Sequence, residues 1–161
     1  FSFTNQDGEI FTEKNVDDKI YVTDFFFTTC PSICPIMKTQ MLRVHEKYAG
    51  NEDVHIVSHS IDPTHDTVEV LHDYAERLDI DTKYWTFLTG EMDSIFRIAQ
   101  EGYLVSAKED STAPGGLLHS GAFILIDKER RIRGYYDGTE EEDVNKLMKD
   151  MDILLSEYEG S

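Results

Sequence analysis

The sequence predicts an α/β fold in which helices cover both faces of a mostly parallel β-sheet. Apolar, strand-like runs alternate with segments of helical periodicity, which is the pattern of a parallel sheet. The run IYVTDFFF (20–27) is apolar or aromatic on both of its faces, as expected of a central strand buried from two sides. Two adjacent strand-like runs follow before a last helix and add antiparallel strands to the sheet.

The N-terminal half begins with an extension to this pattern. FSF and EIF flank the turn cluster Asn5-Gln6-Asp7-Gly8, so residues 1–12 predict a small β-hairpin. A helix is expected at about 35–49, after strand 20–27. Its apolar side comprises Ile36, Met37, Met41, Leu42 and Val44.

The middle of the chain continues the alternation. VHIVSHSI (54–61) predicts a strand, and Asp66 with Glu69 predicts a capping box for a helix that runs to about Leu78. WTFL (85–88) is a short strand-like run. A further helix is expected over 91–101, with Met92, Ile95, Phe96 and Ala99 at helical spacing.

The last third opens with a long polar stretch, 103–118, that contains a Pro-Gly-Gly break. Loops of this length are uncommon and often functional. SGAFILID (120–127) and RIRGYY predict two strands joined by the turn Lys128–Arg130, and a last helix is expected at about 140–157. This order predicts a thioredoxin-like fold with an N-terminal β-hairpin extension, in one domain spanning 1–161.

Composition excludes some partners. With 15 basic and 32 acidic residues, the formal net charge is −17, so nucleic acid is not an expected partner. The acidic surface suits a partner with a basic docking face, but most of these charges are expected to be a solvated surface and nothing more. No apolar run is long enough to span a membrane, and no signal peptide is visible. Because the chain starts at Phe1 without a Met, we expect a trimmed soluble piece of a longer, exported or anchored protein.

Both cysteines of the chain lie in TTCPSICP (28–35). A proline follows each of them and disfavours the α region, so Cys30 and Cys34 are both expected to be non-helical. Pro35 suits the first helical position, which makes Cys34 the expected N-cap. The unpaired N–H groups and the partial positive charge of a helix start stabilise thiolate over thiol.

Three uses of this cysteine pair compete. A structural disulfide is disfavoured, because so short a loop gains little stability. A redox dithiol and a soft-metal site both fit the spacing. Two cysteines are too few for a tetrahedral zinc site but nearly enough for Cu(I), which prefers thiolates and accepts low coordination, and a single imidazole would complete a three-coordinate site.

Six histidines could supply that imidazole. In a thioredoxin-like sheet, the loop that follows the last long connection faces the cysteine turn, which favours His119 in GGLLHSGAF. His45 and His72 lie beside charged residues on predicted helices and are expected to be solvated. His55 and His59 share one face of a strand. For His59 and His65 a structural role is expected, with ligand capture by an exposed imidazole as the alternative.

The chain resembles the Sco/SenC family. The resemblance rests on FFFTTCPSICPIM, SIDPTHDT, WTFLTG and LLHSGAFILID, and it spans nearly the whole chain. It implies a thioredoxin-fold copper chaperone that assembles the binuclear copper site of cytochrome c oxidase, through delivery of copper or reduction of cysteines. Its partners are then the copper-bearing subunit of the oxidase and other copper or thiol-redox proteins.

The resemblance also implies a ligand set. Carried over by position, the copper ligands are Cys30, Cys34 and His119, they bind Cu(I) or Cu(II), and the dithiol can cycle to a disulfide. Members are usually tethered by an N-terminal helix in the periplasm, on the outer face of the membrane or in the mitochondrial intermembrane space. No such tether is visible in this sequence. Leu118 stands where the family often has an acidic residue.

Asp24 keeps a second function open. It lies six residues before Cys30, the offset at which thioredoxins carry a buried aspartate that assists proton transfer. Asp24 could instead be partly exposed or salt-bridged; if it is buried, its pKa is raised. The rival function is a thiol–disulfide oxidoreductase that holds no metal. Met37 and Met41 could bind Cu(I), but core packing is the stronger interpretation.

Overall fold

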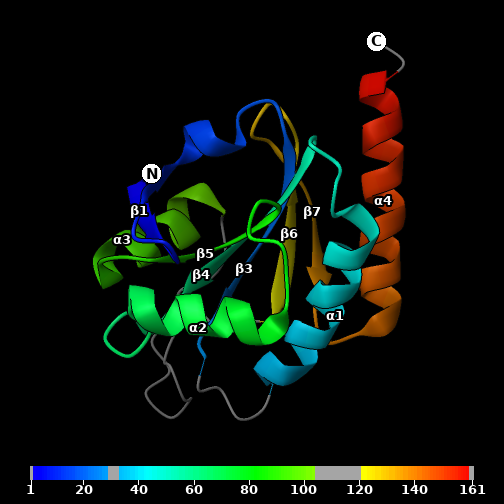
Figure 1. Cartoon of the computed structure of the whole chain (residues 1–161). Coiled ribbons are helices and arrows are strands. Elements are labelled where there is room, and N and C mark those ends of the chain that lie inside the picture. The colour runs from blue at the N-terminus through cyan, green and yellow to red at the C-terminus, as the bar shows by residue number, and fades with distance from the viewer. Residues whose placement is uncertain (1, 29–32, 104–120, 160–161) are drawn as a thin grey trace.

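The computed structural model describes residues 2–28, 33–103 and 121–159, with the backbone alone at 33, 34, 100 and 159 (Figure 1). The strands are Ser2–Asn5 (β1), Ile10–Thr12 (β2), Ile20–Phe26 (β3), Val54–Ser60 (β4), Trp85–Thr89 (β5), Ala122–Ile126 (β6) and Ile132–Asp137 (β7). The helices are Ile33–Tyr48 (α1), Val68–Leu78 (α2), Met92–Arg97 (α3) and Glu141–Glu159 (α4), with helical turns at Glu13–Val16 (η1) and Ile98–Gly102 (η2). The expected order of elements is confirmed. Most of the long loop expected at 103–118 lies outside the described residues.

The strands form one mixed sheet in the order β2-β1-β5-β4-β3-β6-β7. Only the inner strands β3, β4 and β5 pair in parallel among the described residues, while the hairpin and the β6–β7 pair join antiparallel. The sheet is therefore less parallel than the sequence pattern indicated, because the hairpin pairs antiparallel with β5, the outermost of the three parallel strands, and extends the sheet.

The helices occupy the two faces unequally. α1 and α2 each join neighbouring parallel strands in the same direction across the sheet, and right-handed crossovers of this kind place both helices on one face. α4 packs beside α1 there, where the Tyr48 hydroxyl donates to an Asp152 carboxylate oxygen at 2.7 Å (Figure 1). η2 leads to Tyr103 on the opposite face, where the Tyr103 ring lies 6.1 Å from that of Phe25.

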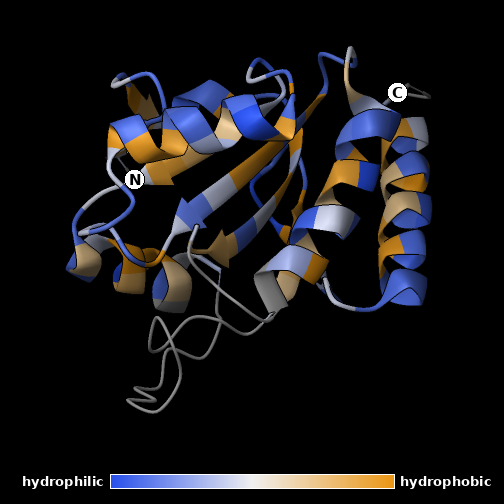
Figure 2. Cartoon of the chain, turned by 60° about the horizontal axis from the view of Figure 1, so that its bottom comes forward, coloured by the Kyte–Doolittle hydropathy of each residue, from blue (hydrophilic) through white to orange (hydrophobic). Residues whose placement is uncertain are grey.

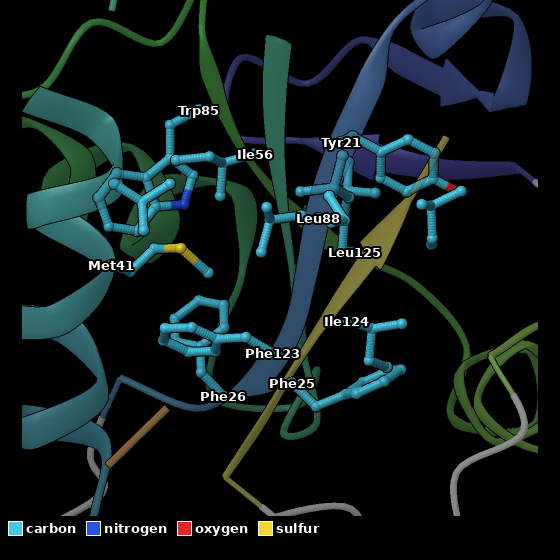
Figure 3. Close-up of a cluster of buried hydrophobic side chains, with 14 of the residues drawn as sticks. Tyr21, Phe25, Phe26, Met41, Ile56, Trp85, Leu88, Phe123, Ile124 and Leu125 are labelled. Atoms are coloured by element: carbon cyan, nitrogen blue, oxygen red, sulfur yellow. The ribbon is translucent and has the colours of Figure 1, made fainter. Parts of the chain in front are cut away.

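Every residue of β3 is buried, and its side chains alternate between the two faces. Figure 3 shows Phe26 on the side of Met41 and Trp85, and Tyr21 and Phe25 on the other side. α2 and α4 turn hydrophobic residues toward the sheet and hydrophilic residues outward (Figure 2). The expected burial of Met37, Met41 and Val44 in α1 is confirmed, but Ile36 is 47% exposed. Ile36 lies on the outer side of the first turns of α1. The sequence analysis placed it on the apolar side of the helix because it counted hydrophobic residues and had no information on which of them face the sheet.

The N-terminal hairpin is fixed to the sheet by a side chain as well as by strand pairing. β1 pairs with β5 only at Thr4↔Thr89 and Asn5↔Leu88. One residue further on, the buried side chain of Gln6 accepts a hydrogen bond from the Phe87 backbone N–H at 3.0 Å. The amide side chain thus takes the place of the next backbone acceptor in the ladder.

We expect Gln6→Ala to lower the free energy of unfolding by about 1–3 kcal/mol, because it leaves the buried Phe87 N–H without its acceptor. Urea denaturation followed by circular dichroism measures this change. Gln40→Ala is the matched control, since among the described residues Gln40 accepts from Arg43 of its own helix alone (2.7 Å), and its cost should stay below about 1 kcal/mol. Equal costs for the two variants would contradict the role assigned to Gln6.

Candidate metal centre

The three predicted copper ligands lie largely beyond what the structure describes. Cys30 and His119 fall outside the described residues, and Cys34 is described by its backbone alone. Their convergence therefore stays a prediction. The structure does place the elements on either side of the cysteine turn: β3 ends at Phe26 and leads to Thr28, and α1 begins at Ile33.

The start of α1 corrects one expectation. Because the helix begins at Ile33, Cys34 lies in its first turn instead of at a non-helical N-cap. Proline is tolerated at Pro35 because the N–H groups of a first turn have no intrahelical acceptor. The expected chemistry is unchanged, since the first turn carries the free N–H groups and the positive end of the helix dipole that favour thiolate.

A buried carboxylate lies next to the cysteine turn. Asp66 is 0% exposed, and its carboxylate accepts hydrogen bonds from the Thr28 backbone N–H at 3.1 Å, from the Thr28 hydroxyl, and from the Ser60 hydroxyl at 2.8 Å. Thr28 and Ser60 follow or end the adjacent strands β3 and β4. Asp66 therefore connects the chain entering the cysteine turn to the loop that follows β4.

The capping box expected from Asp66 and Glu69 is wrong. Thr67 is the N-cap of α2, and its hydroxyl accepts from the Val70 N–H at 3.4 Å. The side chain of Asp66, one residue earlier, points into the protein instead. There its carboxylate accepts hydrogen bonds from the Thr28 N–H, the Thr28 hydroxyl and the Ser60 hydroxyl. The sequence analysis missed this role. The available signal was the hydroxyl-bearing Thr28 and Ser60, each at the carboxyl end of a buried strand.

Asp24 is buried, which settles the alternatives left open for it. It is 4% exposed, and the structure gives it no ion pair among the described residues. The Ser58 hydroxyl donates to the Asp24 carboxyl at 2.5 Å and accepts from the Trp85 indole N–H at 3.0 Å. Burial raises the pKa of Asp24 to about 7, because only part of the lost hydration is replaced by hydrogen bonds.

Asp24 points toward the helix that carries Cys34. A cavity of about 10 Å³ separates the Asp24 and Ser58 side chains from Met37 and Lys38 of α1. A cavity of this size holds about one water molecule. Asp24 therefore lies beneath the second turn of the helix whose first turn contains Cys34. Met37 and Met41 line the same cavity and belong to the core, which confirms the packing interpretation.

The described histidines are mostly structural. His59 is 1% exposed, and its ring stacks on Phe25 with 5.3 Å between centroids, so the expected structural role is confirmed. Burial lowers the pKa of His59 to about 3 and that of His55 to about 4. Both rings therefore stay neutral at physiological pH, His55 with its Nε2 2.7 Å from the Thr86 hydroxyl.

His45 corrects a second expectation. It was expected to be solvated but is 7% exposed, and its Nε2 accepts from the Asp81 backbone N–H at 3.2 Å. The loop before β5 covers it, which the local charges of α1 could not predict. His72 is exposed, as expected, between Asp7 and Glu76. His65 is exposed on the loop that carries Asp66.

No group of three or more His, Cys, Asp or Glu side chains that could hold a metal ion occurs within the described ranges. A three-donor site must therefore use at least one side chain from outside them. The cysteine turn and the segment that contains His119 are both outside, so the predicted ligand set is compatible with this finding.

Comparison with solved structures gives the same fold. A SCO1/SenC family lipoprotein from Bacillus anthracis matches with a TM-score of 0.84 and 32% identity, over 96% of this chain and 92% of that one. BsSco, described as a member of the Sco family of cytochrome c oxidase assembly proteins with a disulfide switch, matches with a TM-score of 0.80 and 28% identity (94% and 89% covered). Arabidopsis thaliana ScoI with copper bound gives a TM-score of 0.75 and 28% identity (98% and 97% covered).

These likenesses support the thioredoxin-like fold, since the structures that match are Sco proteins along nearly their whole length. Within the described ranges, no helix is both long and apolar enough to cross a membrane. The SCO1/SenC family model matches residues 1–155, and the chain therefore belongs to the SCO1/SenC family.

Proposed function

We propose that this protein binds copper as cargo and delivers it to the copper-bearing subunit of cytochrome c oxidase. The observation that carries the proposal is the family match over residues 1–155, which includes both cysteines and His119. A family member of similar structure holds copper, and another is described as an oxidase assembly protein. The proposed ligands are the thiolates of Cys30 and Cys34 and the neutral imidazole of His119.

The donor set suits the cargo. Two thiolates and one imidazole match Cu(I), and the same donors accept Cu(II). The first turn of α1 supports the thiolate form of Cys34, because the helix dipole is positive at this end and first-turn N–H groups have no acceptor within the helix. Transfer runs by ligand exchange, in which a thiol or imidazole of the acceptor displaces one donor while the others hold the ion.

The same relatives support a proposal for where the protein acts. We propose that the protein acts outside the cytoplasm, in the periplasm or on the outer face of the membrane, and is held there by an anchor; the support is that the similar protein from Bacillus anthracis is a lipoprotein. The 161 residues act as one thioredoxin-like domain. The net charge of −17 favours a docking partner with a basic face and disfavours nucleic acid.

Replacing the imidazole separates the copper function from thiol chemistry. We expect His119→Ala to weaken Cu(I) and Cu(II) binding at least tenfold and to abolish or shift the thiolate-to-Cu(II) absorption, because one donor of three is lost. Disulfide exchange with a small thiol should stay within about twofold of wild type. A Cu(I) competition titration and absorption spectroscopy measure the binding.

His72→Ala is the matched control, because His72 is an exposed histidine of α2 outside the proposed ligand set. It should bind copper as wild type does. Wild-type copper affinity in His119→Ala, or loss of affinity in His72→Ala alone, would overturn the ligand assignment.

The second candidate is a thiol–disulfide oxidoreductase, and the burial of Asp24 favours it. A carboxyl group that titrates near neutral pH beneath the helix of Cys34 can take the proton that a thiol releases when it attacks a disulfide. The structural relative BsSco is described as carrying a disulfide switch. Copper transfer and dithiol chemistry can share the same cysteines, so a variant of Asp24 tests the second function separately from the first.

The pKa of Asp24 can be tested through the pH dependence of the free energy of unfolding. Its folded pKa of about 7 exceeds the usual 3.8, so its stabilising contribution is complete below pH 4 and is lost as the pH rises to 7. Asp24→Asn keeps an acceptor for Ser58 and removes the charge. Relative to wild type, we expect the variant to gain on the order of 3 kcal/mol between pH 5 and pH 8.

Urea denaturation of the reduced, metal-free proteins at both pH values measures this difference. The protonation of His55 and His59 affects both proteins equally, so it cancels in the comparison. A difference between variant and wild type that does not change with pH would show that Asp24 does not titrate in this range.

The same variant tests the role of Asp24 in exchange. At pH 7 we expect Asp24→Asn to slow thiol–disulfide exchange about tenfold, because the internal base is missing. The deficit should shrink toward pH 9, where the thiols ionise without help. Stopped-flow measurement with a disulfide dye gives the rates. If the rates match wild type across this range, the oxidoreductase candidate loses the observation that favours it.

A further inference from the structure

Three buried polar side chains from neighbouring strands form a short hydrogen-bonded chain in the core. The register of the sheet pairs Asp24 of β3 with Ser58 of β4, and it pairs Trp85 of β5 with Ile56, two residues before Ser58. Because side chains alternate along a strand, all three point to the same face of the sheet. Figure 3 shows Trp85 on this face, on the side of Met41.

The direction of the hydrogen bonds in this chain is fixed by the chemistry of its members. The Trp85 indole N–H donates to the Ser58 hydroxyl oxygen at 3.0 Å, and an indole nitrogen is a donor only. The Ser58 hydroxyl has a single proton, which it donates to the Asp24 carboxyl group at 2.5 Å. The indole therefore holds the hydroxyl in the orientation that directs its proton to Asp24.

The Ser58 hydroxyl opposes the effect of burial on Asp24. Burial raises the pKa of Asp24, and the hydrogen bond from Ser58 lowers it. A hydrogen bond to a carboxylate is stronger than one to the neutral acid, so it favours the charged form. Without this hydroxyl, Asp24 would keep its proton well above neutral pH and could not accept another.

Other titratable groups lie close to this chain of hydrogen bonds. Lys38 of α1 and Tyr74 of α2 line the same small cavity as Asp24. The ring of His45 of α1 lies 5.7 Å from that of Trp85, and burial lowers the pKa of His45. An experiment on Asp24 must therefore separate its response to pH from the responses of these groups.

We propose that Ser58, oriented by the indole of Trp85, is the positioning residue that lets Asp24 release and take up a proton reversibly. The proposal rests on the second candidate function, in which Asp24 takes a proton from a thiol during disulfide exchange. Ser58 acts through Asp24 and exchanges no proton with the thiol itself. Trp85 is in addition an internal reporter, because it is the only tryptophan of the chain and is connected to Asp24 through one hydroxyl group.

The first test follows the Asp24 carboxyl group directly. Carbon-13 NMR of the reduced, metal-free protein with labelled aspartate should show a carboxyl resonance that titrates with a midpoint near pH 7 and is missing from Asp24→Asn. We expect Ser58→Ala to raise this midpoint by about one to two pH units, because a hydrogen bond to a charged group is lost. An unchanged midpoint in Ser58→Ala would overturn the proposal.

Trp85→Phe tests the orienting role of the indole. This variant keeps an aromatic ring and the Ser58 hydroxyl but removes the N–H, so the hydroxyl is free to rotate away from Asp24. We expect a smaller rise of the midpoint, of about half a pH unit. An unchanged midpoint in this variant would remove Trp85 from the proposal. If Ser58→Ala does not fold, Trp85→Phe carries the test alone, and the same result then counts against the whole proposal.

Two control variants separate this role from charge and from stability. Lys38→Met removes the cation beside the cavity and should move the Asp24 midpoint less than Ser58→Ala does; a larger shift would assign the effect to charge and count against Ser58. Thr86→Val removes another buried hydroxyl, which lies 2.7 Å from the His55 Nε2 on the other face of β5. It should unfold at a lower temperature and keep the wild-type midpoint. Equal shifts in Thr86→Val and Ser58→Ala would overturn the specific role of Ser58.

The fluorescence of Trp85 gives a second readout. Its emission should change with pH at the same midpoint as the carboxyl resonance, and this change should be absent from Asp24→Asn. A step caused by His45 lies at lower pH and remains in both proteins, because burial lowers the pKa of that histidine. Constant emission while the Asp24 resonance titrates would contradict the connection between Trp85 and Asp24.

Exchange kinetics distinguish this proposal from the function on which it rests. At pH 7, Ser58→Ala should slow thiol–disulfide exchange to the rate of Asp24→Asn, because its carboxyl group stays protonated. If the midpoint rises while exchange keeps the wild-type rate, the positioning role stands and the oxidoreductase candidate fails. If the midpoint does not move while Asp24→Asn slows exchange, the positioning role fails and the candidate stands.

Discussion

The burial of β3 on both faces is the constraint on which the rest of the molecule depends. All seven of its residues, Ile20–Phe26, are buried, and β4 and β6 flank it within the sheet. A slip of one residue would send every side chain to the opposite face. The register therefore fixes that Asp24 faces α1 and that Phe25 faces His59 and Tyr103. Because the residues of β3 are buried, reactive side chains that must reach a partner come after the strand, and Cys30 lies in the turn that follows it.

Two buried carboxyl groups near this turn meet the cost of burial in different ways. Asp66 receives three hydrogen bonds, from Thr28 and Ser60, and these offset its loss of hydration. Asp24 receives one side-chain hydrogen bond, from Ser58, and its pKa rises to about 7. A buried carboxylate that accepts several hydrogen bonds is held in one position as a charged group. A buried carboxyl group that accepts few hydrogen bonds is more easily protonated. The two residues therefore differ: Asp66 is a fixed contact between Thr28 and Ser60, whereas Asp24 is a carboxyl group that can change its protonation near neutral pH.

Local patterns in the sequence were enough to predict the order of elements, since strands such as β3 and helices such as α2 bury enough apolar surface to be recognised alone. The details that failed depend on contacts far apart in the chain. His45 is buried by the loop of Asp81, and Asp66 is turned inward by donors that arrive from Thr28. Neither partner is near in sequence. The predicted copper ligands Cys30, Cys34 and His119 came from the family resemblance and from the preference of copper for thiolates. No sequence pattern predicts the distances between these three side chains.

The positions of the described histidines limit which histidine could be the third copper ligand beside the two cysteines. His45, His55 and His59 are enclosed in the core, so copper cannot reach them without partial unfolding. Of the two exposed rings, His72 stands between Asp7 and Glu76 on α2, and His65 lies on the Asp66 loop without two further donors gathered around it among the described side chains. His119 is the one remaining histidine of the six. If the cysteine pair binds copper with an imidazole, the choice is between His65, which would use the loop that Asp66 already fixes, and His119, which would bring in a separate segment. We favour His119, because it lies in the sequence far from the loop that carries Asp66, and a carrier that must release its cargo gains from a donor that can be displaced without breaking the hydrogen bonds of that loop.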